Sequence, residues 1–137
     1  MTLKITEIKA EIIRRLETID NVDAFSGYFD MFAETTSGLL AVLQSNSDKC
    51  GVKPTKQVSD RSLFLMLGVR ASSTADNDRE QLLVDARRVL FNELSNPLNQ
   101  LAIEFESTEE AVFSRTDTFS YLTVTLPLRV KYLQLTP

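Results

Sequence analysis

Residues 119–133 read FSYLTVTLPLRVKYL and carry the clearest secondary-structure pattern in the chain. Apolar and polar side chains alternate there, which is the period of a β-strand with one face against a core. The apolar set is Leu122, Val124, Leu126, Leu128, Val130 and Tyr132. Because Pro127 has no N–H to give to a neighbouring strand, we expect this strand to lie at a sheet edge or to bulge at that residue.

Three other segments have the composition of strands: GLLAVLQ at 38–44, SLFLMLGVR at 62–70 and LAIEFE at 101–106. The first two are separated by SNSDKCGVKPTKQVSD, residues 45–60, which we expect to be a polar loop. A connection of that length is usually functional or mobile. We expect the aromatic-rich segment 21–36 to be a loop that contains a short strand or turn.

Two segments have the 3.6-residue period of amphipathic helices. The first runs through residues 5–19, with isoleucine and leucine at spacings of three and four. The second runs from about Asp78 to Leu94 and ends before Pro97, because proline disfavours helical backbone in the residue that precedes it. The predicted order is therefore α-β-β-α-β-β.

This order predicts an α+β fold in which residues 1–137 form a single domain. Its economical form is one antiparallel or mixed sheet with two helices packed on one face. The length of 137 residues, with 43% hydrophobic and 25% charged residues, is typical of one globular domain.

The charge balance and the single cysteine narrow the class of protein further. The net charge is −4, whereas a dedicated nucleic-acid binder usually carries a basic patch, although local contact with nucleic acid stays open. With only Cys50, no disulfide can form within the chain, which fits a reducing compartment. The start of the sequence lacks a secretory signal pattern, and no apolar run is long enough to predict a membrane span.

The sequence offers little for catalysis, because it contains no histidine, the commonest general base and metal ligand near neutral pH. Cys50, between Lys49 and Lys53, is either a reactive thiol or an exposed cysteine without a role. We favour the second interpretation, since no base partner is evident.

A run of carboxylates is the other candidate for chemistry. These residues are Glu104, Glu106, Glu109 and Glu110. Their spacing matches no calcium loop, so we interpret them as outward charges around a turn rather than as a metal or paired-acid site. We therefore expect no enzyme activity, no cofactor and no metal.

Two features suggest assembly with other proteins instead. Segment 62–70 is apolar on both faces, so either another subunit or the aromatic stretch 25–32 must cover the face that the helices leave free. We predict that Phe64 and Met66 pack against another subunit.

The second feature is the set of lysines in segment 45–60: Lys49, Lys53 and Lys56, with Arg61 close behind. They are either a basic finger that touches a partner or nucleic acid, or an ordinary solvated loop. From these residues alone we favour the solvated loop.

The layout of the whole chain resembles the tail-terminator family of long-tailed phages, the minor tail protein U-like proteins. The resemblance lies in the succession LKITEIKAEIIRRLETI, GLLAVLQ, RSLFLMLGVRAS, NDREQLLVDARRVLFNEL and YLTVTLPLRVKY. Two segments depart from the family pattern. Residues 45–60 lack the expected acidic character, and residues 21–36 are unusually aromatic.

The resemblance implies a ring, typically a hexamer, that caps the tail tube and ends its polymerisation. Such a ring would offer the joining surface for the head-completion or connector protein and would leave a central channel for DNA. It would lie at the tail–head junction of the virion after assembly in the host cytoplasm. Lys49, Lys53 and Lys56 would then contact the tube or line the channel. The competing class is a small acidic secretion-type chaperone that acts as a dimer on an effector segment.

Overall fold

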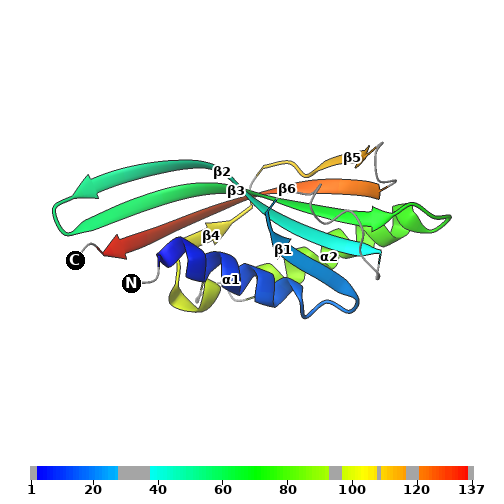
Figure 1. Ribbon diagram of the computed structural model, residues 1–137, viewed down its shortest axis with the longest axis horizontal. Helices are drawn as coiled ribbons and strands as arrows, with labels where there is room; N and C mark the ends of the chain where they lie inside the picture. The colour runs from blue at the N-terminus through cyan, green and yellow to red at the C-terminus, as the bar shows by residue number, and fades with distance from the viewer. Residues whose placement is uncertain (1–2, 28–37, 93–96, 108, 117–120, 136–137) are drawn as a thin grey trace.

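The centre of the sheet consists of three antiparallel strands of 15 residues each, β2 (Leu39–Lys53), β3 (Lys56–Arg70) and β6 (Tyr121–Leu135). β3 lies between the other two and pairs with β6 along its whole length. In the computed structural model these strands run along the longest axis of the molecule (Figure 1). The structure describes residues 3–27, 38–92, 97–107, 109–116 and 121–135.

Three short strands complete the sheet. β1 (Val22–Ser26) pairs in parallel with the start of β2, which makes the sheet mixed. β4 (Glu104–Glu106) and β5 (Val112–Thr116) both pair with β6, at opposite ends of the edge that β3 does not occupy. The strand order is β1-β2-β3-β6-β4, with β5 beside β6.

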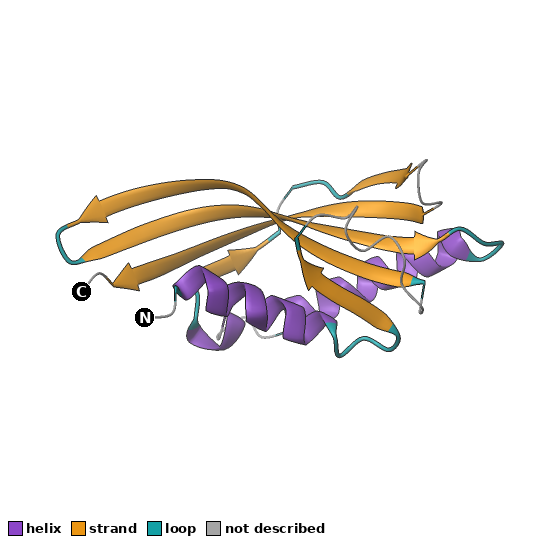
Figure 2. Ribbon diagram, viewed as in Figure 1, coloured by secondary structure: helices purple, strands orange, loops and turns teal. Residues whose placement is uncertain are grey.

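Two α-helices, α1 (Lys4–Leu16) and α2 (Ala75–Leu90), lie on the same face of the sheet (Figure 2). A short 3-10 turn, η2 (Pro97–Gln100), follows α2. Neither α1 nor α2 has the length and apolar content needed to cross a bilayer, and the same is true of every helix within the described ranges.

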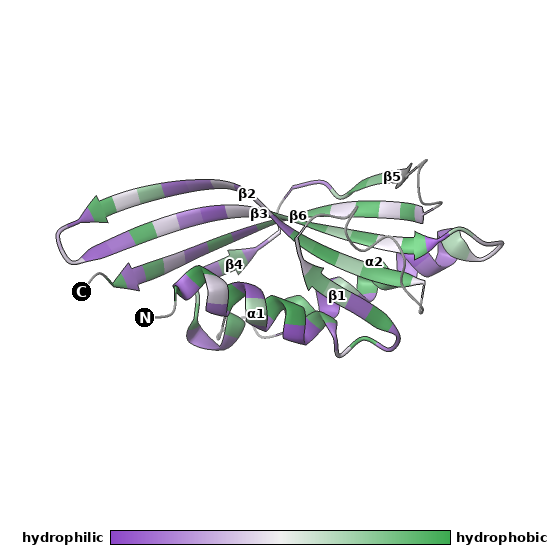
Figure 3. Cartoon of the chain, in the orientation of Figure 1, coloured by the Kyte–Doolittle hydropathy of each residue, from purple (hydrophilic) through white to green (hydrophobic). Residues whose placement is uncertain are grey.

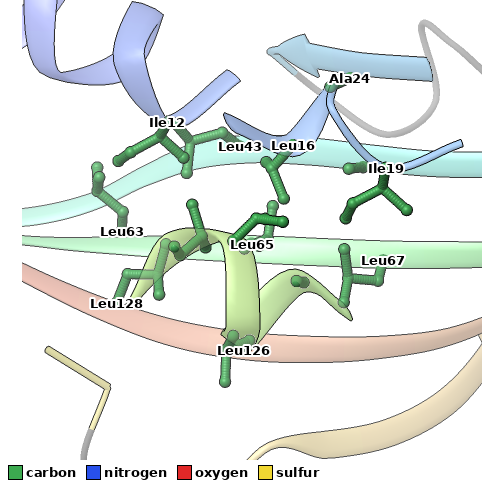
Figure 4. Packing of buried hydrophobic residues seen from close by; sticks show 14 of the residues in the cluster. Ile12, Leu16, Ile19, Ala24, Leu43, Leu63, Leu65, Leu67, Leu126 and Leu128 are labelled. Carbon is green, nitrogen blue, oxygen red and sulfur yellow. The ribbon is translucent and has the colours of Figure 1, made fainter. Parts of the chain in front are cut away.

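The core lies between the helices and the sheet, and it follows the alternation predicted for residues 119–133. Leu126 and Leu128 of β6 point at α1 and α2 together with Leu63, Leu65 and Leu67 of β3, and all five are at most 1% exposed. Figure 4 shows these side chains meeting the side chains of α1. The predicted apolar face of β6 is therefore confirmed.

Pro127 lies at a gap in the edge of β6, as its missing N–H requires. β4 pairs with residues 129–131 of β6, and β5 pairs with residues 121–125 of β6. Neither strand therefore reaches Pro127. The Pro127 carbonyl accepts a hydrogen bond of 2.6 Å from the Ser107 hydroxyl, on the side away from β3. Because the N and O atoms of one strand residue point to the same side, the proline nitrogen faces this gap and no ladder bond is lost.

The main correction concerns residues 45–60, which we expected to be a loop. They belong to a β-hairpin in which only Pro54 and Thr55 separate β2 from β3, with Lys53 directly opposite Lys56. Helices cover little of this part of the sheet, so its side chains need not alternate between apolar and polar. The usual sequence signal of a strand is therefore missing.

The predicted α+β class, with two helices and one mixed sheet in a single small domain, is confirmed. The predicted order α-β-β-α-β-β holds only in outline, because the described residues form six strands rather than four. One addition, β1, is the short strand expected within segment 21–36. Residues 28–36 of that segment lie outside the described ranges.

Candidate interaction surface

The end of the long hairpin, together with the end of β6, projects past the helices as a three-stranded arm (Figure 1). We define the arm as residues 45–62 and 129–135. The start of α1 lies against the helix-facing side of β6 and β3, where the Lys4 backbone N–H donates to the Gln134 side chain at 2.7 Å and Tyr132 and Ser59 are buried. In contrast, every β2 residue of the arm is exposed.

The strand register shows which arm side chains face away from the helices. Since Leu63 and Leu65 point toward the helices, residues of even number in β3 and their cross-strand partners point outward. We call this outward surface the arm face. It consists of Lys49, Gly51, Lys53, Lys56, Val58, Asp60, Lys131, Leu133 and Leu135.

The arm face combines an apolar strip with a frame of lysines. Figure 3 shows that the strands of the arm carry both hydrophobic and hydrophilic residues. Val58 and Leu133 are cross-strand neighbours, and Leu135, which is 63% exposed, follows on β6. Gly51 is the cross-strand neighbour of Val58 on β2. A Cβ atom added at Gly51 would meet no atom within 4 Å, so the space above Gly51 is accessible to another molecule. An apolar centre with a charged border is the usual composition of a protein–protein contact.

The base of the arm is held by a charged cluster around Arg129. Its guanidinium binds both carboxylate oxygens of Asp60, with Nε to Oδ1 at 2.7 Å, and also reaches Glu106 of β4 at 3.1 Å. These hydrogen bonds lower the pKa of Asp60, and the nearby Lys131 and Lys49 lower it further. Asp60 in turn raises the pKa of Arg129.

A groove of about 380 Å³ adjoins this cluster on the same side of the sheet. Phe64, Pro127 and Arg129 are among the residues that line it. Phe64 is half-buried, so part of its ring is available to another molecule.

Met66, the second residue predicted to contact another subunit, already has neighbours within its own chain. It packs against a small cluster of Leu40, Val42, Tyr121 and Phe25 on the outward side of the sheet. Phe25 belongs to the aromatic stretch that was the alternative cover for this face. The structure thus separates Phe64, which lines an open groove, from Met66, which supports the fold.

The three predicted lysines come together, but on strands and not on a loop. Lys53 and Lys56 face each other across the hairpin, and Lys49 lies further along the same outward face. Sequence reasoning missed Lys131, Leu133 and Leu135, which complete the arm face from β6. Their outward position is readable from the alternation of residues 119–133, but their proximity to the lysines depends on the β3–β6 register.

The two candidates for chemistry lie on solvent-facing surface. Cys50 is exposed on the arm, and its sulfur has only weak contacts, such as the Gln57 side chain at 4.0 Å. Glu106 pairs with Arg129, and Glu104, Glu109 and Glu110 are exposed. Within the described ranges, no three acidic or sulfur ligands gather in a way that could hold a metal ion.

Charge is distributed very unevenly along the molecule. The arm carries six basic residues and two acidic ones, a net charge of +4, so the rest of a chain of net charge −4 carries −8. At the opposite end (Figure 1), residues 17–26 and 70–85 carry seven acidic residues against two arginines, a net charge of −5. We call these two segments the acidic end.

The acidic end is also hollowed. A groove of about 680 Å³ lies between the end of α1, the start of β2 and one side of α2. Asp20, Asp78 and Asp85 line it together with two arginines, Arg70 and Arg88.

A scan of the chain against models of protein families finds no match, and a search among curated proteins finds no relative.

Proposed function

We propose that this chain is a structural subunit of a phage tail terminator. In this role it forms a ring, by the family resemblance a hexamer, that caps the tail tube and stops its polymerisation. The ring also offers the surface that the head-completion or connector protein joins, and DNA passes through its channel.

The observation that carries this proposal is the arm. The arm adds Val130 and Tyr132 to the core, but its outward face carries a partly exposed apolar strip with a border of lysines, which is the composition of a contact surface. An adaptor between a tube and a head needs such surfaces more than it needs a catalytic site.

Three further features support the proposal. The succession of amphipathic helix, hydrophobic strand, long strand, second helix and alternating final strand is the layout on which the resemblance rests. Phe64 lines an open groove beside the arm, where a neighbouring subunit can pack. Lys49, Lys53 and Lys56 share one face, so a single acidic partner can contact all three.

The test is polymerisation of the tail tube protein encoded in the same genome, with and without this chain, followed by electron microscopy of tube length. We expect tubes of limited length with an extra ring at one end. Tubes that grow without limit and carry no ring contradict the proposal. A stable dimer by light scattering that binds an unfolded effector segment, with no effect on tubes, indicates the chaperone instead.

A further inference from the structure

We propose that the arm face of one copy docks on the acidic end of the next copy, so that subunits associate head to tail. This inference deepens the proposed function and rests on it, because it names the partner of the arm. It follows from the charges and shapes of the two ends of the molecule.

The first step is charge complementarity. The arm has a net charge of +4 and the acidic end a net charge of −5, although the chain as a whole is acidic. Surfaces of opposite charge attract each other during association and exclude wrong partners. A second copy of this chain always supplies the matching surface at the same concentration as the arm.

The second step is geometry. The hairpin turn of the arm and the start of α2 lie at opposite extremes of the longest axis (Figure 1), so the arm cannot fold back onto the start of α2 in its own chain. A contact between two different surfaces of identical subunits is heterologous and generates a closed ring when the rotation per subunit closes. This is the kind of symmetry that a tail-capping ring requires.

The third step is that the arm offers its face rather than its edge. An exposed edge strand can recruit another strand, but the β2 edge of the arm has features that prevent this. It carries a bulge between Ser45 and Ser47, lysines at Lys49 and Lys53, and Pro54 at the turn. The open apolar strip of Val58, Leu133 and Leu135 is therefore the surface left for docking.

The fourth step is that the acidic end has apolar surface to receive that strip. Val84 of α2 is 58% exposed, and Leu39 of β2, which is partly exposed, lines the groove. Apolar contact at the centre and ion pairs at the border then occur in one interface.

The test uses two variants that each lose one half of the contact. In the arm variant, K49E/K53E/K56E, the arm charge changes from +4 to −2. In the end variant, E17K/D20K, the charge of the acidic end changes from −5 to −1. Glu17 and Asp20 are exposed at the C-terminal end of α1, where the helix dipole favours positive charge, so this change leaves the fold stable.

Sedimentation velocity at low ionic strength, where exposed charges interact over about 30 Å, provides the readout. We expect the wild-type chain to form species larger than two subunits and each variant alone to sediment as a monomer. An equimolar mixture of the two variants should stop at a heterodimer, because only one intact pair of surfaces remains. The chain that carries both sets of changes should stay monomeric, since its arm then has a charge of −2 and its acidic end a charge of −1, and like charges repel.

R87E serves as the matched control, because it changes charge by the same amount as K53E but lies on neither surface. It should assemble like the wild type, and circular dichroism should show the same fold in all variants. A monomeric wild type at low ionic strength overturns the inference, as does a mixture that forms no heterodimer or an arm variant that assembles normally.

The tube assay separates this inference from the proposed function. If the arm variant still forms capping rings, the head-to-tail inference is wrong and the terminator proposal stands. If the wild type assembles through these surfaces but never limits tube growth, the inference stands and the terminator proposal fails.

Discussion

Arg129 binds both carboxylate oxygens of Asp60 across the β3–β6 ladder, although the two residues are not directly opposite. The residue opposite Arg129 is Ser62, so the ion pair is diagonal and spans two positions along the strand. The same guanidinium reaches Glu106 of β4 at 3.1 Å. One side chain thus connects three strands at the base of the arm.

The pKa of Asp60 should rise when Arg129 is replaced by alanine. The hydrogen bonds and charge of Arg129 are the largest cause of the lowered pKa of Asp60, with smaller contributions from Lys131 and Lys49. A ¹³C NMR titration of the Asp60 carboxyl group measures the change directly. R14A, far from the arm, should leave the pKa of Asp60 unchanged, and an unchanged value in R129A would show that the pair is not formed in solution.

Substitution of Glu11 by glutamine should destabilise the fold by about 3 kcal/mol, because it leaves a buried charge without its partner. Glu11 and Arg15 are 8% and 7% exposed and are hydrogen-bonded to each other at 3.2 Å. Arg15 also donates to the Leu90 carbonyl at the end of α2, and Glu11 accepts from Asn99 at 2.8 Å. Urea unfolding of E11Q and wild type at neutral pH measures the loss, and R14A, whose side chain is 60% exposed, should lose much less.

The stability that Glu11 contributes should disappear at acid pH. The pKa of folded Glu11 is lowered from its ordinary value of 4.5, first by the hydrogen bond from Arg14 and then by Arg15. A lowered carboxyl pKa stabilises the fold above the unfolded value, and this stability is lost as pH falls through the folded value. The difference between E11Q and wild type should therefore narrow below pH 4.5, and a gap that stays constant would argue against the ion pair.

The elements that could be predicted from the sequence are those that bury one face in the hydrophobic core. In β6, apolar and polar residues alternate because side chains such as Val130 and Tyr132 are buried. In α1, the helical period exists because Ile8 and Ile12 are buried. The predicted helix boundaries differ from the observed ones: α1 ends at Leu16 rather than near residue 19, and α2 begins at Ala75 rather than Asp78.

The arm could not be predicted, for the converse reason. Its β2 residues are exposed, so no burial imposes a periodic pattern on Ser45–Lys53. The hairpin turn at Pro54 and Thr55 also lacks the Asn-Gly or Asp-Gly pair that usually identifies a two-residue connection. The contact role of the three lysines stays a prediction, and their neighbours from β6 depend on long-range pairing that local sequence does not encode.

Phe64 and Met66 should respond differently to substitution. Met66 is partly buried and packs in a cluster with Leu40 and Val42, so M66A should lower the free energy of unfolding by about 2 kcal/mol, the low end of the range for buried positions, and leave assembly intact. Phe64 lines an open groove, so F64S should weaken assembly more than folding. Urea unfolding and sedimentation of both variants test this, and normal assembly of F64S would remove Phe64 from the interface.

Shortening the hairpin should abolish assembly while the domain still folds. The register allows a clean deletion: removal of residues 52–53 and 56–57 takes out two cross-strand pairs and makes Gly51 and Val58 the closing pair around Pro54 and Thr55. Because the same number of residues is removed from each strand, the remaining pairs keep their register and every remaining side chain keeps its face. The deletion removes Lys53 and Lys56 from the arm face but no side chain of the hydrophobic core. Far-UV circular dichroism and urea unfolding should therefore show a folded domain, and sedimentation at low ionic strength should show a monomer.

The control variant K53A/K56A removes the same charges from a hairpin of full length and so measures how much of the effect is electrostatic. Its assembly should weaken further as salt screens the remaining lysines. Normal assembly of the shortened chain would show that the arm is not the contact.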